Sequence, residues 1–201
     1  MSKTKICTEE MGKWLKILFW LLIISTVAGI FITEETVEKV PALQLVSTLF
    51  VIAYGGVLLK MSACDPACGR YRTAGICKIL SAALSAALSL LSGGTGVTAF
   101  ALVLLALLAA AALDIAGEYQ ELKGHAAVLQ ERDLLLSEKW LRLVKWYVGL
   151  LAGSAAGVIL SALLPLAGVV LVLAAGVGII VVSVVKIVYL YRTGKDYCVS
   201  R

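Results

Sequence analysis

Four long stretches without a charged residue constrain this chain more than any other feature. No Asp, Glu, Lys, Arg or His occurs in 17–33, 40–59, 79–113 or 146–185. One crossing of a lipid bilayer takes about 20 apolar residues, so each of the first two stretches predicts one span. A single helix over the fourth stretch would be about 60 Å long. We therefore expect two spans there, with a break at Pro165.

The amino-acid composition excludes an ordinary soluble protein. Hydrophobic residues make up 61% of the chain and charged residues 15%, against about 45–50% and about 25% in globular domains. A soluble core of this size could not bury that much apolar surface, so the bilayer is the expected solvent. The same figures exclude a disordered chain, a coiled coil and a small disulfide scaffold. The net charge of +5 requires no nucleic-acid partner, because membrane topology explains it.

The third stretch, 79–113, is too long for one span and contains the turn-forming run Ser-Gly-Gly-Thr-Gly at 92–96. Lysine and arginine concentrate on the cytoplasmic side of membrane proteins. Two spans over this stretch place all but Lys39 of the 18 basic residues on one side, whereas one span divides them almost evenly. The sequence therefore predicts six spans.

The predicted fold is an all-α, polytopic integral membrane helix bundle, in which residues 1–201 form one transmembrane domain. Six transmembrane helices make three hairpins, and both termini are cytoplasmic. The expected spans are 14–32, 41–59, 73–92, 97–117, 142–163 and 166–190. The expected location is a bacterial-type inner membrane, that is, the plasma membrane. A cleaved signal peptide over 1–32 is disfavoured, because its apolar stretch is long and no Ala-x-Ala site follows.

Small residues recur at regular spacing in two of the expected spans. Lipid supplies no hydrophobic force between helices, so close packing needs such residues. They are Gly149, Gly153 and Gly157 in the fifth span, and Ser81, Ser85 and Ser89 in the third. We expect the glycine face to pack within the chain, and a dimer face or sliding gate is the alternative. The serine hydroxyls are expected to bond within their own helix or to a neighbour.

Ionisable side chains in the middle of a span are costly and mark pathways for ions or protons. The central turns of the six expected spans contain none. Asp114 and Lys186 lie about one turn inside the inner ends of their spans, and we expect both to reach water at the inner interface. A direct pair between them is the alternative. The interior is therefore expected to lack a buried proton relay, which argues against an ion-coupled carrier.

Three cysteines at cytoplasmic positions have spacing that resembles a metal site. Cys64 and Cys68 are four residues apart, and Cys77 follows nine residues later. Zinc and iron–sulfur sites use thiolates at similar spacing, followed by further ligands. Candidates for the fourth ligand are Cys7, Cys198 and His125. Because no paired CxxC motif occurs, we favour small residues at an interface, with a zinc or iron–sulfur site as the alternative.

The longest polar segment, 118–145, is predicted to be a cytoplasmic helical connector. We expect the fourth span to continue past the membrane, break near Gly124-His125, and return as an amphipathic helix. Such a helix docks a cytoplasmic protein partner or lies on lipid headgroups, and a solvated connector is the third interpretation. His125, the one histidine of the chain, is expected to be polar surface.

Nucleotide-binding, metalloprotease and hydrolase motifs are missing from the sequence, so an enzyme is not favoured. The leading prediction is a non-enzymatic multi-pass membrane protein whose cytoplasmic face binds a partner or senses the bilayer. One alternative is a small channel or carrier, working as a homo-oligomer through the serine and glycine faces. The other is a thiol or metal enzyme at the inner interface.

Overall fold

The computed structural model of the chain describes residues 3–31, 42–64, 69–91 and 97–199. The helices are α1 (Lys3–Phe31), α3 (Ala42–Cys64), α4 (Gly69–Leu91), α5 (Val97–Leu129), α6 (Leu134–Leu163) and α7 (Pro165–Val199). They leave only short turns within these ranges, and none of the described residues forms a strand. The predicted all-α helix bundle is confirmed.

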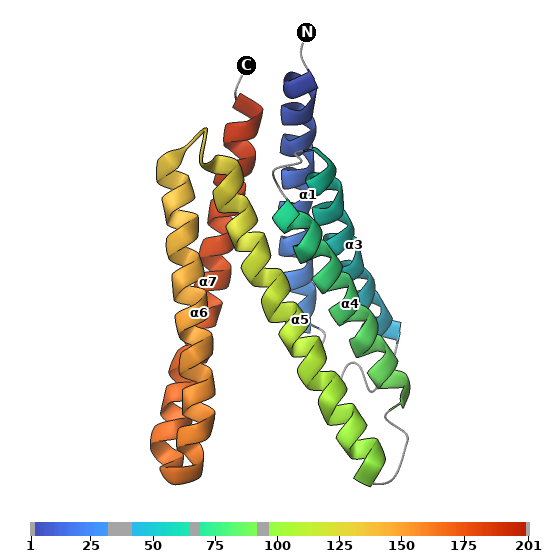
Figure 1. Cartoon of the computed structure of the whole chain (residues 1–201), viewed down its shortest axis with the longest axis vertical. Helices are drawn as coiled ribbons and strands as arrows, with labels where there is room; N and C mark the ends of the chain where they lie inside the picture. Colours follow the sequence, from blue (N-terminus) through green and yellow to red (C-terminus); the bar gives the residue numbers. More distant parts are fainter. Residues whose placement is uncertain (1–2, 32–41, 65–68, 92–96, 200–201) are drawn as a thin grey trace.

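The six helices run alternately up and down the bundle (Figure 1). Each helix packs against the next one along the chain, and α1 also packs against α7, so that the helices form a closed ring. Both termini lie at one end, which we call the terminal end. The opposite end, where α6 turns into α7, is the distal end. This arrangement agrees with three hairpins.

Five of the described helices are long and apolar enough to cross a membrane, as a multi-pass membrane protein requires. Their apolar segments are Glu9–Ala28, Leu45–Cys64, Phe100–Leu129, Leu134–Leu163 and Pro165–Lys195. The described part of α4, at the place of the third expected span, does not reach this level. It carries Arg70, Arg72 and Lys78 and is otherwise rich in alanine and serine. It packs against α3 on one side and α5 on the other.

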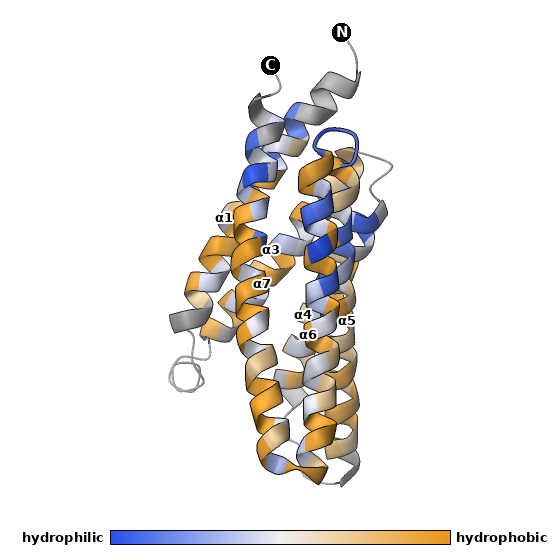
Figure 2. Cartoon of the chain, turned by 90° about the vertical axis from the view of Figure 1, so that its left-hand side faces the viewer, coloured by the Kyte–Doolittle hydropathy of each residue, from blue (hydrophilic) through white to orange (hydrophobic). Residues whose placement is uncertain are grey.

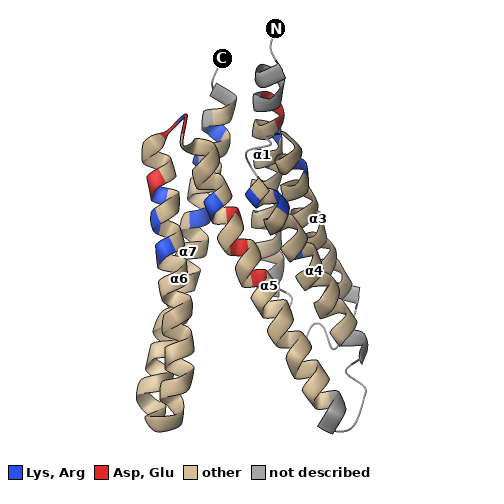
Figure 3. Cartoon of the chain, viewed as in Figure 1, with Lys and Arg blue, Asp and Glu red and all other residues tan. Residues whose placement is uncertain are grey.

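Apolar and charged side chains separate along the bundle. Hydrophobic residues dominate toward the distal end (Figure 2), and the described charged residues gather in the terminal half (Figure 3). Large apolar side chains of the distal half face outward, with Leu163 77% and Leu166 81% exposed. An apolar surface of this extent suits hydrocarbon rather than water. The largest fully buried side chains of the described residues lie in the terminal half, among them Leu15, Leu58 and Trp140.

Two connections test the expected helix ends. The break at Pro165 is confirmed: α6 ends at Leu163, and Pro165 is the first residue of α7, where proline's missing N–H costs nothing. The expected break near Gly124-His125 is wrong, because α5 continues to Leu129. Packing explains the difference, since both residues are buried between neighbouring helices. The turn follows Leu129, and the Asp133 side chain caps α6 by accepting a hydrogen bond from the Leu136 N–H at 3.0 Å.

Candidate functional site

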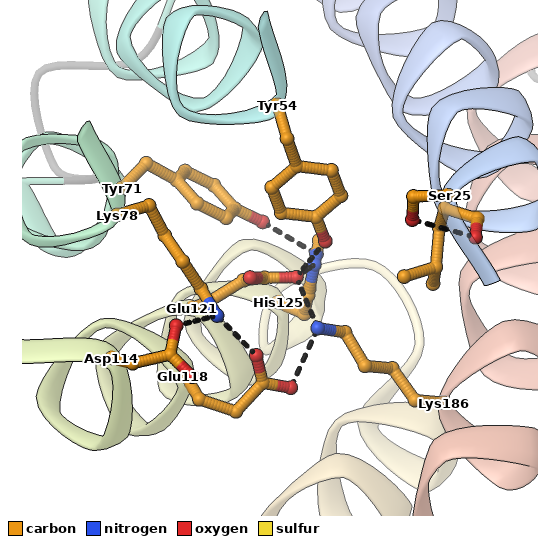
Figure 4. A network of polar contacts seen from close by, with 10 residues as sticks. Ser25, Tyr54, Tyr71, Lys78, Asp114, Glu118, Glu121, His125 and Lys186 are labelled. Atoms are coloured by element: carbon orange, nitrogen blue, oxygen red, sulfur yellow. Dashed lines mark hydrogen bonds and ion pairs between the residues drawn. The ribbon is translucent and has the colours of Figure 1, made fainter. Parts of the chain in front are cut away.

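One face of α5 carries four ionisable residues, namely Asp114, Glu118, Glu121 and His125. Spacings of four, three and four residues place them on the same side of the helix. This face turns into the bundle, where Lys78 of α4 and Lys186 of α7 meet it (Figure 4). We call these six residues the ionic network.

Two lysines hold the carboxylates of the ionic network together. Lys186 Nζ lies 2.6 Å from Glu118 Oε1 and 2.8 Å from Glu121 Oε1. Lys78 Nζ lies 2.8 Å from Asp114 Oδ1 and 3.1 Å from Glu118 Oε2. Glu118 therefore joins the two lysines through its two oxygens. These pairs connect α5 to α4 and to α7, so they link three helices at one level of the bundle.

Burial differs along the ionic network. Glu121 and His125 are completely buried and Lys186 is 5% exposed, whereas the Asp114 side chain is 54% exposed. Glu121 Oε1 accepts hydrogen bonds from Lys186 and from the Tyr54 hydroxyl. Oε2 of Glu121 and Nε2 of His125 have no hydrogen-bond partner, and Nε2 is 3.6 Å from Glu121 Oε1. Buried polar atoms without a partner are rare, and they suggest a place for a proton or a ligand atom.

Aromatic residues enclose His125 on the terminal side of the ionic network. The Tyr71 hydroxyl lies 2.8 Å from His125 Nδ1, and the Trp140 indole stacks on the imidazole with ring centroids 4.6 Å apart. The Trp140 Nε1–H donates to Thr193 Oγ1 at 3.2 Å, which fixes the indole. Gly124 makes room for Tyr71, since a Cβ there would lie 2.9 Å from the tyrosine ring. The imidazole orientation is therefore set by α4, α6 and α7.

A pocket of about 270 Å³ lies on the other side of the ionic network. Lys78, Asp114, Glu118 and Lys186 form its charged wall. Its remaining lining residues are Leu22 and Ser25 of α1 and Phe50, Val51 and Tyr54 of α3. The pocket therefore combines a charged wall with a largely apolar wall from α1 and α3.

Asp114 and Lys186 both belong to the ionic network, although the described contacts do not pair them with each other. Asp114 pairs with Lys78, while Lys186 pairs with Glu118 and Glu121. The expectation that Lys186 reaches water is wrong, because its carboxylate partners keep it inside the bundle at 5% exposure. The bundle thus holds a buried ionic network, while the expected absence of a buried proton relay stays a prediction.

The predicted cysteine site is described only in part. Cys64 and Cys77 are half-buried, and Cys64 Sγ lies 3.9 Å from Glu10 Oε2. Cys68 lies outside the described residues. Among the residues that the structure describes, no three His, Cys, Asp or Glu side chains are grouped to hold a metal ion. The zinc or iron–sulfur site stays a prediction.

The glycine and serine faces are only partly used in the described packing. An added Cβ at Gly157 would lie 2.8 Å from Val172 Cγ2, but at Gly149 or Gly153 it would meet nothing within 4 Å. The expectation that the glycine face packs within the chain is therefore wrong for Gly149 and Gly153. Of the three glycines, Gly157 is the one at which α7 approaches α6 closely. Ser81 Oγ donates to the Ala110 carbonyl of α5 at 3.0 Å, as one of the two expected bonding modes requires.

Ser85 is exposed, and the side chain of Ser89 lies outside the described residues. A close approach of α3 and α4 occurs at Gly55 and Gly75, which sequence analysis did not single out. A Cβ on Gly75 would lie 2.7 Å from the Gly55 carbonyl oxygen.

Sequence analysis missed Glu118 and Glu121 as site residues and weighed His125 only as a metal ligand, because all three were placed in a polar connector. One signal could have found them. The helical spacing from Asp114 to His125 places four ionisable side chains on one face, directly after an apolar segment. A single polar stripe of this kind indicates a buried network when other spans cover it.

Comparisons with known proteins identify no relative: no protein family, curated protein or solved structure matches the chain. The ionic network and its adjoining pocket therefore provide the functional evidence.

Proposed function

We propose that the chain is a membrane carrier for a small organic monocation, such as an alkylammonium ion, which binds in the pocket beside the ionic network. One observation carries this proposal. Three carboxylates, from Asp114, Glu118 and Glu121, pair with two ammonium groups among the described residues, those of Lys78 and Lys186. With a neutral His125, the ionic network has one negative charge in excess.

An unbalanced charge inside a membrane protein is costly, and such groups usually serve a substrate, ion or proton pathway. A single positive charge would balance the ionic network. That charge is either a proton on His125 or a cation in the pocket. The two unpaired atoms, Glu121 Oε2 and His125 Nε2, support a site whose occupancy changes.

The pocket favours an organic cation over a fully hydrated ion. Asp114 offers a half-exposed carboxylate for an ammonium group, while Leu22, Phe50 and Val51 offer apolar contact for attached carbons. A volume of about 270 Å³ is slightly below the usual range of about 300–1,000 Å³ for drug-sized ligands. The substrate is therefore expected to be small.

Carriers must expose a site to either side in turn, and the ionic network lies where such a change would be controlled. Tyr71, His125 and Trp140 close its terminal side, and the pocket adjoins it at Lys78, Asp114, Glu118 and Lys186. Lys186 connects α7 to α5 through two carboxylates. A bound cation that weakens these pairs would loosen α7 from α5, which is the type of helix movement that switching proteins use.

Tetramethylammonium is a suitable probe, because its permanent charge prevents leakage as a neutral base. We expect it to raise the thermal stability of the full chain in lipid nanodiscs, whereas tert-butanol, its neutral isostere, does not. We also expect saturable uptake into proteoliposomes. Asp114→Asn should abolish both effects. Glu138→Gln is the matched control, because Glu138 is exposed on α6 away from the pocket.

Three results would overturn the proposal. They are equal stabilisation by tert-butanol, binding that Asp114→Asn leaves unchanged, and uptake no faster than in protein-free liposomes. Stabilisation without uptake would restrict the site to binding and would exclude a carrier.

A further inference from the structure

A separate groove lies between α1 and α7 near the terminal end. Its volume is about 430 Å³. Leu15 and Leu190 line it and are completely buried, while Phe19 is half-buried. Trp20 and Tyr191 also line it and are 61% and 58% exposed. The groove therefore has an apolar interior and an aromatic margin that is open to the surroundings.

Two lysines from different helices line the same groove. Lys16 belongs to α1 and Lys195 to α7, and both are exposed. Within the part of the chain that the structure describes, neither ammonium lies within ion-pair distance of a carboxylate. The helices approach closely here, since a Cβ on Gly194 would lie 3.8 Å from Leu15 Cβ and 4.0 Å from Lys16 Cγ. This approach brings two positive charges without described partners to one groove.

The groove lies at the boundary between the charged and apolar parts of the bundle. Lys16 directly precedes the uncharged part of α1, residues 17–31, and Lys195 ends the apolar segment of α7. The Phe19 ring contacts the rings of Trp20 and Tyr191, at centroid distances of 5.6 and 5.5 Å. Amphipathic aromatic rings prefer the headgroup level of a bilayer. The two lysines are therefore placed where lipid phosphates lie.

We propose that the groove between α1 and α7 binds one anionic phospholipid, with its phosphate between Lys16 and Lys195. Basic pockets between membrane helices bind anionic headgroups in this way. The apolar interior of the groove accepts the first carbons of an acyl chain. Exposed apolar residues farther toward the distal end, such as Ile24 and Val184, continue this contact. The site is independent of the ionic network, and it does not require that the chain transport anything.

Lipid titration of the full chain in a neutral detergent tests this assignment. Native mass spectrometry would count phosphatidylglycerol and phosphatidylcholine molecules with identical acyl chains on each protein. We expect one phosphatidylglycerol to bind about tenfold or more tightly than phosphatidylcholine. The double variant Lys16→Gln/Lys195→Gln should lose this preference. Both lysines are exposed, so the variant is expected to fold, and its melting temperature checks this.

The double variant Lys139→Gln/Lys145→Gln is the control, because it removes two exposed lysines of α6 and changes the net charge equally. It should keep the lipid preference. Equal binding of phosphatidylcholine would show nonspecific apolar contact and would overturn the proposal. Equally tight binding of glycerol phosphate would assign the site to a free phosphate compound instead. Loss of the preference in the α6 control would show that only net charge matters, which also overturns the site.

Discussion

The Tyr71 hydroxyl lies 2.8 Å from Nδ1 of His125, and both side chains are completely buried. When this hydroxyl donates to Nδ1, the ring proton resides on Nε2 and faces Glu121 Oε1 at 3.6 Å. A tyrosine on α4 therefore orients a histidine on α5 toward the most buried carboxylate of the ionic network. The Trp140 indole of α6 stacks on the face of the same imidazole ring.

Tyr71→Phe removes the hydroxyl and leaves Nδ1 of His125 without its described partner. A buried polar atom that loses its hydrogen bond costs about 1–3 kcal/mol, and we expect a loss of this size in the free energy of unfolding. Denaturant titration in detergent micelles measures it. Tyr119→Phe is the control, since the described contact of Tyr119 is between its ring and Lys123 Nζ. An equal loss in both variants would contradict the role of the Tyr71 hydroxyl.

Lys186→Met tests the centre of the ionic network. It leaves Glu118 and Glu121 without the ammonium that both contact. Removing one partner of a buried ion pair destabilises a protein by about 3–5 kcal/mol, and the melting temperature should fall accordingly. Adding Glu121→Gln should restore part of the stability, because the second change removes a buried negative charge. Lys139→Met, at an exposed position of α6, should change little.

Proton competition gives the proposed cation site a defined pH dependence. Protonation gives histidine one positive charge, and a protonated His125 would balance the excess negative charge. Tetramethylammonium binding should therefore weaken as the pH falls and strengthen as it rises. Groups facing His125 are Tyr71 of α4, Glu121 of α5 and Trp140 of α6, with Tyr54 and Lys186 bound to the same Glu121 oxygen.

His125→Gln checks the origin of this dependence, because glutamine keeps hydrogen-bonding atoms and does not titrate in this range. The binding constant of the variant for tetramethylammonium should vary less with pH than that of the parent protein when both are measured from about pH 8 to about pH 5. An unchanged pH profile in this variant would assign the competing proton to a carboxylate of the ionic network.

The sequence was sufficient for the six helices that the structure describes and for the α6–α7 turn, because uncharged runs and Pro165 encode them locally. It was not sufficient for the ionic network. Lys78, Glu121 and Lys186 come from three helices, and their meeting depends on how the hairpins pack. His125 was expected at the surface because a lone histidine next to glycine resembles a turn. Only the covering side chains Tyr71 and Trp140 make it a core residue.

Gly55→Ala tests the closest approach of α3 and α4. The new methyl would lie 2.7 Å from Ile79 Cγ1 and 2.9 Å from the Gly75 carbonyl oxygen. Overpacking of this type costs about 1–3 kcal/mol, which should lower the melting temperature in lipid or detergent. The neighbouring Gly56→Ala is a matched control, since an added Cβ there meets nothing within 4 Å. Equal effects of both changes would mean that α3 and α4 do not pack at Gly55.

Gly157→Ala and Gly153→Ala separate the two parts of the glycine face on α6. At Gly157 the methyl would lie 2.8 Å from Val172 Cγ2 and 3.1 Å from the Val172 backbone nitrogen. We expect a loss of about 1–3 kcal/mol from this crowding. At Gly153 the methyl has free space, and the higher helix propensity of alanine should leave stability unchanged or raise it by up to about 1 kcal/mol. Thermal unfolding of the two variants in the same lipid measures the difference.

Gly153→Leu then distinguishes a lipid-facing surface from a contact between copies of the chain. Within one chain, nothing lies within 4 Å of a Cβ at this position, so leucine should be accepted at a surface that faces hydrocarbon. If Gly149 and Gly153 instead admit a second copy, leucine separates the two backbones, because close helix contact in lipid depends on small residues. The particle mass in detergent would then fall while the melting temperature of the single chain is retained. Unchanged mass and stability would identify this face as a lipid contact, and only Gly157 would remain a packing position.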